Sequence, residues 1–230
     1  MERKVCTVCD LEIEENYCTR CGQKFTGHKL SVLFLISDFL SNFFSLNKSG
    51  FSTIFRVLAD PKKVTTNYSL GYRNYYSSPG NILLYGIAMI TLHLLLIDKT
   101  ALNFRVGDSV LSAQYGFLIA FYPFIMIVSY LSFIRKKVTF SEHLVSTLYT
   151  STSVLILIVL MSDIIYLFSG KLFEMEAFWV FMILAFFWNS RVFTAENKFK
   201  NILQNTLLQC LVFTVIVGIV LLLNLILATK

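Results

Sequence analysis

The sequence predicts an all-α membrane protein with about five transmembrane helices, preceded by a small cysteine-rich unit and amphipathic interfacial helices. The 230-residue chain is 56% hydrophobic, above the roughly 45–50% of a soluble domain, and its mean hydropathy is +0.66. Charged residues are absent from Ser109 to Ile134 and from Asn201 to Thr229. Each of these blocks is longer than the about 20 residues that a helix needs to cross a bilayer core. The third observation is the cysteine cluster before the first apolar block.

The cluster lies in "CTVCDLEIEENYCTRCGQK", where Cys6, Cys9, Cys18 and Cys21 form two CxxC pairs. Two such pairs can close a tetrahedron of thiolates, as structural zinc requires. A segment this short cannot build a sufficient core, so metal binding would supply its folding free energy. We therefore expect a zinc ribbon over residues 1–27, with zinc as a structural cofactor. A rubredoxin-like iron site, a dithiol redox pair and a disulfide are the alternatives.

Residues 28–79 are predicted to form amphipathic interfacial helices. Apolar residues recur at three- to four-residue steps over 30–44, and most of the polar ones fall on another face, which is typical of a helix lying in the membrane interface. A helix packed on the membrane bundle is the alternative. Asp60 and Pro61 predict the start of a second helix, and Gly71 its end. The stretch that follows suits the lipid headgroup layer: Tyr72, Arg73, Tyr75 and Tyr76.

Residues 80–230 are predicted to form the transmembrane bundle. The five expected spans are Ile82–Ile97, Val110–Ile134, Leu144–Phe168, Ala177–Ser190 and Ile202–Ala228. The fourth has a short uncharged core, so a re-entrant segment is its alternative. Trp179 and Trp188 near its ends favour a span with anchors at both membrane interfaces.

The loop charges predict the orientation of the bundle. Basic residues follow the second span at Arg135, Lys136 and Lys137, and they follow the fourth span at Arg191, Lys198 and Lys200. The other loops are nearly neutral. Because no secretory signal opens the chain, we expect a cytoplasmic N-terminus, and the basic loops then lie on its side, as the positive-inside rule requires. Cytoplasmic thiols are kept reduced, which favours metal binding over a disulfide.

Ionisable residues inside a span are functional candidates by default. His93 is expected near the middle of the first span, where it would relay protons, bind an ion, or simply hydrogen-bond to a neighbouring helix. No acidic partner is expected at its depth, because Asp163 falls near the outer end of the third span. Glu142 and His143 open that third span, and Thr139 with Glu142 predicts a capping box. Cys210 is interpreted as a small packing residue.

The ordered motifs resemble a known family. They are the ribbon ending "CTRCGQK", the stretch "SDFLSNFFSLNKSGFSTIFRVLADPKKVTTNYSLGYRNYYSSPGNILL" and the later "RKKVTFSEHLV". Together they resemble an uncharacterised bacterial family of zinc-ribbon, multi-span membrane proteins, described as a domain of unknown function. Lys48, Ser49, Tyr72 and Asn74 depart from its pattern. The resemblance implies a bacterial cytoplasmic (inner) membrane and gives weight to Glu142 and His143, but it supplies no activity.

The sequence therefore leads to three hypotheses. The favoured one is a non-enzymatic docking or scaffold protein, whose cytoplasmic zinc ribbon binds a protein partner at the inner face of the membrane. The second is a small transporter or channel that uses His93. The third is a lipid-modifying membrane enzyme with Glu142 and His143 as acid and base. The expected partners are the lipid bilayer and a protein at the cytoplasmic face of the membrane. A homo-oligomer is also compatible with the sequence. Nucleic acid is not expected, because Glu12, Glu14 and Glu15 crowd the ribbon loop.

Overall fold

The structure is a computed structural model that describes residues 5–6, 9, 11–12, 17–20, 31–33, 35–37, 49–71, 75–97, 110–136, 138–195 and 198–228; for 49 and 110–120 it describes the backbone only. Seven helices are defined in it. They are α2 (Ser49–Ala59), α3 (Pro61–Ser69), α4 (Pro79–Leu96), α5 (Val110–Ser132), α6 (Phe140–Ser169), α7 (Glu174–Phe193) and α8 (Phe199–Ala228).

Four of these helices, α4, α6, α7 and α8, are long and apolar enough to cross a membrane. They coincide with the first, third, fourth and fifth predicted spans. The fourth is longer than its uncharged core suggested, because α7 is one continuous helix of 20 residues, about 30 Å long. This length favours the span over the re-entrant alternative. The helix α5 coincides with the second predicted span and has 23 residues, and its role as a fifth span remains a prediction.

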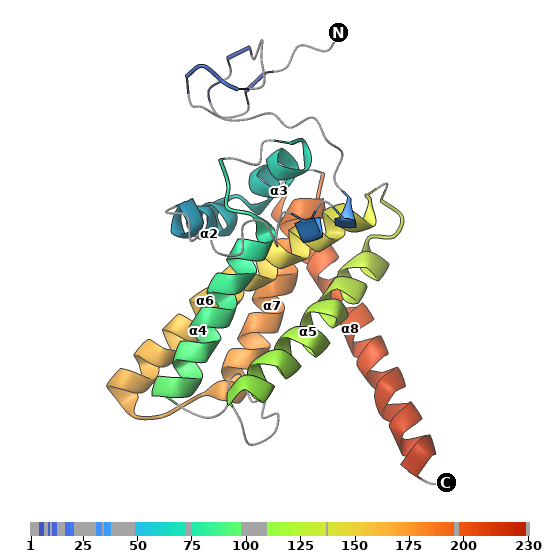
Figure 1. The fold of residues 1–230 in the computed structure, drawn as a ribbon. Coiled ribbons are helices and arrows are strands. Elements are labelled where there is room, and N and C mark those ends of the chain that lie inside the picture. The colour runs from blue at the N-terminus through green and yellow to red at the C-terminus, as the bar shows by residue number, and fades with distance from the viewer. Residues whose placement is uncertain are drawn as a thin grey trace.

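The helices α4 to α7 form a bundle in which α6 packs against α4, α5 and α7 (Figure 1). The short helices α2 and α3 lie across one end of this bundle. The helix α8 packs on α5 and α7 near its start, and its C-terminal half extends away from the other helices in Figure 1. None of its most apolar 18-residue window is buried by the described residues, so this half of α8 would face lipid.

Local sequence signals set the helix ends as predicted. The Asp60 carboxylate accepts a hydrogen bond from the Lys63 N–H at the start of α3, and Pro61 holds the first helical position. Gly71, just beyond the end of α3, adopts a φ of 99°, which an L side chain rarely tolerates. Thr139 and Glu142 form the predicted capping box of α6. The first-turn carboxylate also complements the helix dipole.

The helices α2 and α3 are held on the bundle by hydrogen bonds to the carbonyl ends of helices. Arg191 of α7 donates to the carbonyls of Leu58 and Ala59 at the end of α2. Conversely, Lys62 of α3 donates to the Thr194 and Ala195 carbonyls just beyond α7. Each cation therefore satisfies carbonyls that a helix end leaves unpaired.

A third cation completes this arrangement. Lys136, which follows α5, donates to the Phe193 carbonyl at the end of α7. Partial burial, followed by the nearby Lys62, lowers the pKa of Lys136. Since Lys136 and Arg191 come from the two basic segments, these segments share one end of the bundle with α2 and α3. For residues 49–59, these contacts favour the alternative of a helix packed on the membrane bundle.

The close packing of α4 on α6 depends on Gly86. A Cβ atom built on Gly86 would lie 2.6 Å from Cγ2 of Thr152. Thr152 cannot rotate away freely, because its hydroxyl hydrogen-bonds the Tyr122 hydroxyl at 2.7 Å. Gly86→Ala should therefore lower the free energy of unfolding by about 1–3 kcal/mol, the usual cost of overpacking.

The measurement is the midpoint of thermal unfolding of the purified protein in detergent. Gly218→Ala in α8 is the matched control, because no atom lies within 4 Å of its added Cβ and alanine favours a helix by about 1 kcal/mol over glycine. Equal midpoints for the two variants would contradict the packing argument.

Candidate functional sites

The N-terminal cysteines form a candidate metal centre. The sulfur atoms of Cys6, Cys9 and Cys18 all lie within 4.8 Å of one another, and Cys6 and Cys18 are buried. Around a tetrahedral zinc with bonds of about 2.3 Å, sulfur atoms would be about 3.8 Å apart. The described thiols therefore fit a metal ion after a small contraction. Cys21, the fourth predicted ligand, lies outside the described residues.

The chain turns back on itself around the first cysteine pair. Val5 and Glu12 form an isolated antiparallel bridge, and the Cys6 N–H donates to the Leu11 carbonyl at 2.8 Å. Cys9 lies within this turn, and the Cys18 sulfur lies within 4.8 Å of the sulfurs of Cys6 and Cys9. The arrangement can hold an ion structurally.

A second polar site lies inside the bundle, where Asn189 of α7 connects three helices. Its amide oxygen accepts from the Ser146 hydroxyl of α6 at 2.9 Å. Its amide nitrogen donates to the Ser129 hydroxyl of α5 at 2.7 Å and to the Gln209 carbonyl oxygen of α8 at 3.1 Å. All four side chains are at most 1% exposed. A buried amide is costly unless it is hydrogen-bonded, so these contacts fix how the four helices meet.

Gln209 extends the network along α7. Its amide nitrogen donates to the Phe186 carbonyl at 3.0 Å and to the Ser190 hydroxyl at 2.7 Å. The Gln209 side chain is thereby used at both its oxygen and its nitrogen. We refer to Ser129, Ser146, Asn189, Ser190 and Gln209 as the amide network.

His143 borders the amide network. Its Nδ1 lies 3.3 Å from the Ser129 hydroxyl, and its ring stacks on Phe193 with 4.5 Å between the centroids. The side chain is 1% exposed, and its Nε2 has no hydrogen-bond partner among the described residues. His143 is therefore a packed residue between α5, α6 and the end of α7.

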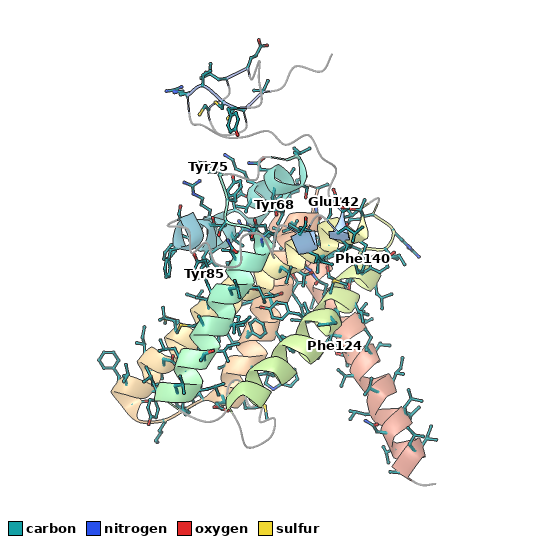
Figure 2. The ribbon with its side chains drawn as sticks, viewed as in Figure 1. Tyr68, Tyr75, Tyr85, Phe124, Phe140 and Glu142 are labelled. Carbon is teal, nitrogen blue, oxygen red and sulfur yellow. The ribbon has the colours of Figure 1, made fainter. Side chains whose placement is uncertain are left out.

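Glu142 has a separate environment. Its carboxylate accepts from the backbone N–H and the hydroxyl of Thr139, at 2.7 and 2.9 Å. It also lines a shallow groove at the contact of α3 with α6 and α7, and Figure 2 shows it at the start of α6. The capping contacts explain Glu142 structurally. His143 contacts other residues, Ser129 and Phe193. The two neighbours in sequence thus have separate sets of contacts in the fold.

A third site pairs two helices near the opposite end of the bundle. His93 lies in the last turn of α4, and its Nδ1 is 2.5 Å from a carboxylate oxygen of Asp163 on α6. The side chains are 4% and 15% exposed. The expectation that His93 has no acidic partner is therefore wrong. Its place near the end of α4 also differs from the expected position in the middle of the span.

The oblique course of α6 explains this error. His93 is about 21 Å along α4 from Pro79, whereas Asp163 is about 35 Å along α6 from Phe140. The two helices descend in the same direction, but α6 crosses the bundle diagonally in Figure 1. Distance along a helix therefore does not give depth, and the residues meet despite their different offsets.

The residues predicted for the membrane interface have different environments. Tyr75 is half-buried, and the Arg56 guanidinium lies 4.2 Å from the centroid of its ring. Tyr76 is only 5% exposed and its hydroxyl accepts from the Asn67 amide. Burial raises the pKa of Tyr76. Tyr76 is thus a core residue of the α2–α3 layer, a correction to its predicted place among lipid headgroups.

The two tryptophans that were predicted as interface anchors differ in their contacts. Trp179 is 50% exposed, and its role at a membrane interface remains a prediction. Trp188 donates from its indole nitrogen to the Leu58 carbonyl at 2.8 Å, so it joins α7 to α2. Tyr72 and Arg73 lie outside the described residues.

The amide network was not predicted from the sequence, because its side chains are neutral and only ionisable residues inside a span are functional candidates by default. A signal was present. Gln209 interrupts an apolar run in "TLLQCLV", and Asn189 follows an aromatic run in "AFFWNS". Buried amides in a membrane segment need interhelical partners as charged groups do.

Removing the central amide should destabilise the bundle. Asn189→Ala would leave the Ser146, Ser129 and Gln209 side chains each with one partner fewer, and we expect a loss of about 1–3 kcal/mol in the free energy of unfolding. The midpoint of thermal unfolding in detergent measures it. Asn224→Ala is the control, because Asn224 is an exposed amide of α8. An unchanged midpoint for Asn189→Ala would show that the network contributes nothing.

In comparisons with known proteins, no protein-family model, curated protein or solved structure matches this chain. The resemblance to zinc-ribbon, multi-span membrane proteins thus remains a prediction from the ordered motifs. What the structure adds is an all-helical chain with four helices fit to span a membrane, and three N-terminal cysteines close enough to hold a metal ion.

Proposed function

We propose that this chain is a non-enzymatic docking protein of the bacterial inner membrane, in which a cytoplasmic zinc ribbon presents a folded surface to a protein partner. The observation that carries the proposal is the convergence of Cys6, Cys9 and Cys18 in a segment outside the helical bundle. Four thiolates with Cys21 would leave no open position on zinc, which suits a structural ion rather than a catalytic one.

The orientation follows from the charges at one end of the bundle. The basic segments that contain Lys136 and Arg191 contact the ends of α7 and α2. The positive-inside rule assigns such an end to the cytoplasm. The ribbon precedes α2 in the chain, so we place its docking surface on the same side of the membrane.

The contacts of Glu142 and His143 favour a docking role over lipid chemistry. Glu142 caps α6, and His143 stacks on Phe193 with its Nδ1 beside Ser129. Both residues therefore have a part in holding the bundle together. We assign neither of them a role as acid or base.

Metal analysis tests the first half of the proposal. The purified protein should contain one zinc ion per chain, and Cys18→Ser should lose it, because three thiolates hold zinc less well than four. Cys210→Ser is the matched control and should retain the metal, since Cys210 lies in α8. Iron in place of zinc, or equal zinc in both variants, would refute the zinc ribbon.

The same variants test docking. Co-purification from native membranes in mild detergent should recover a protein partner with the wild type and with Cys210→Ser. The partner should be lost from Cys18→Ser/Cys21→Ser. A partner retained by that double variant would separate docking from the ribbon.

The His93–Asp163 pair favours a second candidate function, a small transporter or channel. An ion pair or a shared proton between two spans is a common element of proton and cation pathways. Wild-type protein in liposomes should then dissipate a proton or potassium gradient, measured with a fluorescent indicator. His93→Ala and Asp163→Asn should reduce the rate to that of protein-free liposomes, whereas Lys171→Gln, an exposed change just beyond α6, should not. Wild-type liposomes that move no ion would exclude this function.

A further inference from the structure

A groove of about 320 Å³ lies where α2, α3 and the segment before α4 meet. It is lined by Arg56, Asp60, Lys63, Val64, Tyr75 and Tyr76, and Figure 2 shows Tyr75 at this end of the molecule. Two cations face one carboxylate in it, and that carboxylate already accepts the Lys63 backbone N–H. The groove therefore has an excess of positive charge and a tyrosine wall.

The two cations of this groove differ from the others at the same end. Lys62, Lys136 and Arg191 donate to carbonyls at helix ends. By contrast, the side-chain nitrogens of Arg56 and Lys63 donate no hydrogen bond to any residue that the structure describes. The cation–π contact with Tyr75 holds the Arg56 guanidinium beside the ring and leaves its N–H groups for an acceptor, and the planar fork of a guanidinium suits a phosphate.

The helix α2 lies beside the turns of α4 and α7 nearest this end of the bundle, and its depth is at most the distance along those helices. The Phe51 and Tyr85 rings are 5.8 Å apart, so the start of α2 lies beside a residue of α4 that is about 9 Å along the helix from Pro79. The end of α2 receives the Trp188 hydrogen bond, and Trp188 is about 8 Å from the same end of α7. Interfacial helices lie about 5–10 Å into the boundary between headgroups and acyl chains.

The outer face of α2 fits this boundary. Phe51 and Phe55, one helical turn apart, are 68% and 69% exposed, whereas Ile54 and Val57 pack inward. Two exposed phenylalanines at this level would enter the acyl region while Arg56, the next residue on α2, remains among the headgroups.

We propose that this groove binds the phosphate of an anionic phospholipid, with Arg56 and Lys63 as its cationic ligands and with Phe51 and Phe55 in the adjoining acyl layer. A headgroup with a net charge of −1 complements the excess positive charge of the groove. The site is independent of the metal centre and of the His93–Asp163 pair. It would hold α2 and α3 against the membrane and so fix the end of the bundle that faces the cytoplasm.

Native mass spectrometry of the full-length protein tests the proposal. Protein purified from nanodiscs of equal phosphatidylglycerol and phosphatidylcholine should retain the anionic lipid in preference to the zwitterionic one. In Arg56→Gln/Lys63→Gln the preference should fall about thirtyfold, in keeping with an attraction of about 1 kcal/mol for each of two basic residues to anionic lipid. The control Arg135→Gln/Lys200→Gln removes two exposed charges from the same end and should keep the preference.

Each other outcome overturns the proposal. Equal losses in the groove variant and the control would indicate a general charge effect, and an unchanged preference in the groove variant would exclude the groove. Inorganic phosphate at millimolar concentration should not displace the lipid; displacement, with equal thermal stabilisation by phosphate alone, would identify a free-phosphate site. Arg56→Lys, which keeps the charge but loses the planar fork, should show an intermediate preference and guards against misfolding of the double variant.

Discussion

The hydrogen bonds of Asn189 are the constraint on which the rest of the bundle depends. A buried amide has to find partners in a membrane segment, because lipid offers none. Asn189 finds them on α5, α6 and α8 at once, and Gln209 ties α8 back to α7. Apolar side chains alone would let these helices slide or rotate at little cost, since lipid tails are as apolar as a leucine. The amide network gives the packed helices one rotation and one register.

That register has consequences at the end of the bundle where α2 and α3 lie. The last turns of α7 follow Asn189 directly, so the position of Asn189 sets where the Phe193 and Thr194 carbonyls meet Lys136 and Lys62. Trp188 and Arg191, which flank Asn189 on α7, donate hydrogen bonds to carbonyls at the end of α2. The position of α2 and α3 along the bundle therefore depends on the position of the end of α7, which the amide network sets. Arg56 lies on α2 and Lys63 on α3, so the same contacts position the groove in which we propose that a phospholipid headgroup binds.

The polar groups are divided between two regions with different chemistry. The amide network near the α2–α3 end is neutral and highly connected, as suits a structural role. The His93–Asp163 pair near the other end of α4 joins α4 to α6. Between these regions the core is mainly apolar, with Phe121, Ile125, Phe181 and Phe186 among its buried residues. The arrangement keeps the His93–Asp163 pair apart from the amide network.

The sequence by itself determined the long apolar helices, the ends of α3, the start of α6 and the spacing of the cysteines. These depend on local signals: apolar run length, the caps at Asp60 and Thr139, the glycine at position 71, and the spacing of Cys6, Cys9 and Cys18. The tertiary structure alone decided which polar residues meet. The partnership of His93 with Asp163 depends on the tilt of α6, and the burial of Tyr76 depends on the folding of α3 against the segment before α4. Asn189 and Gln209 were visible as amides in apolar runs, but their partners lie on other helices. Helix tilt and rotation result from packing between segments distant in the chain, and the periodicity of one segment carries no information about them.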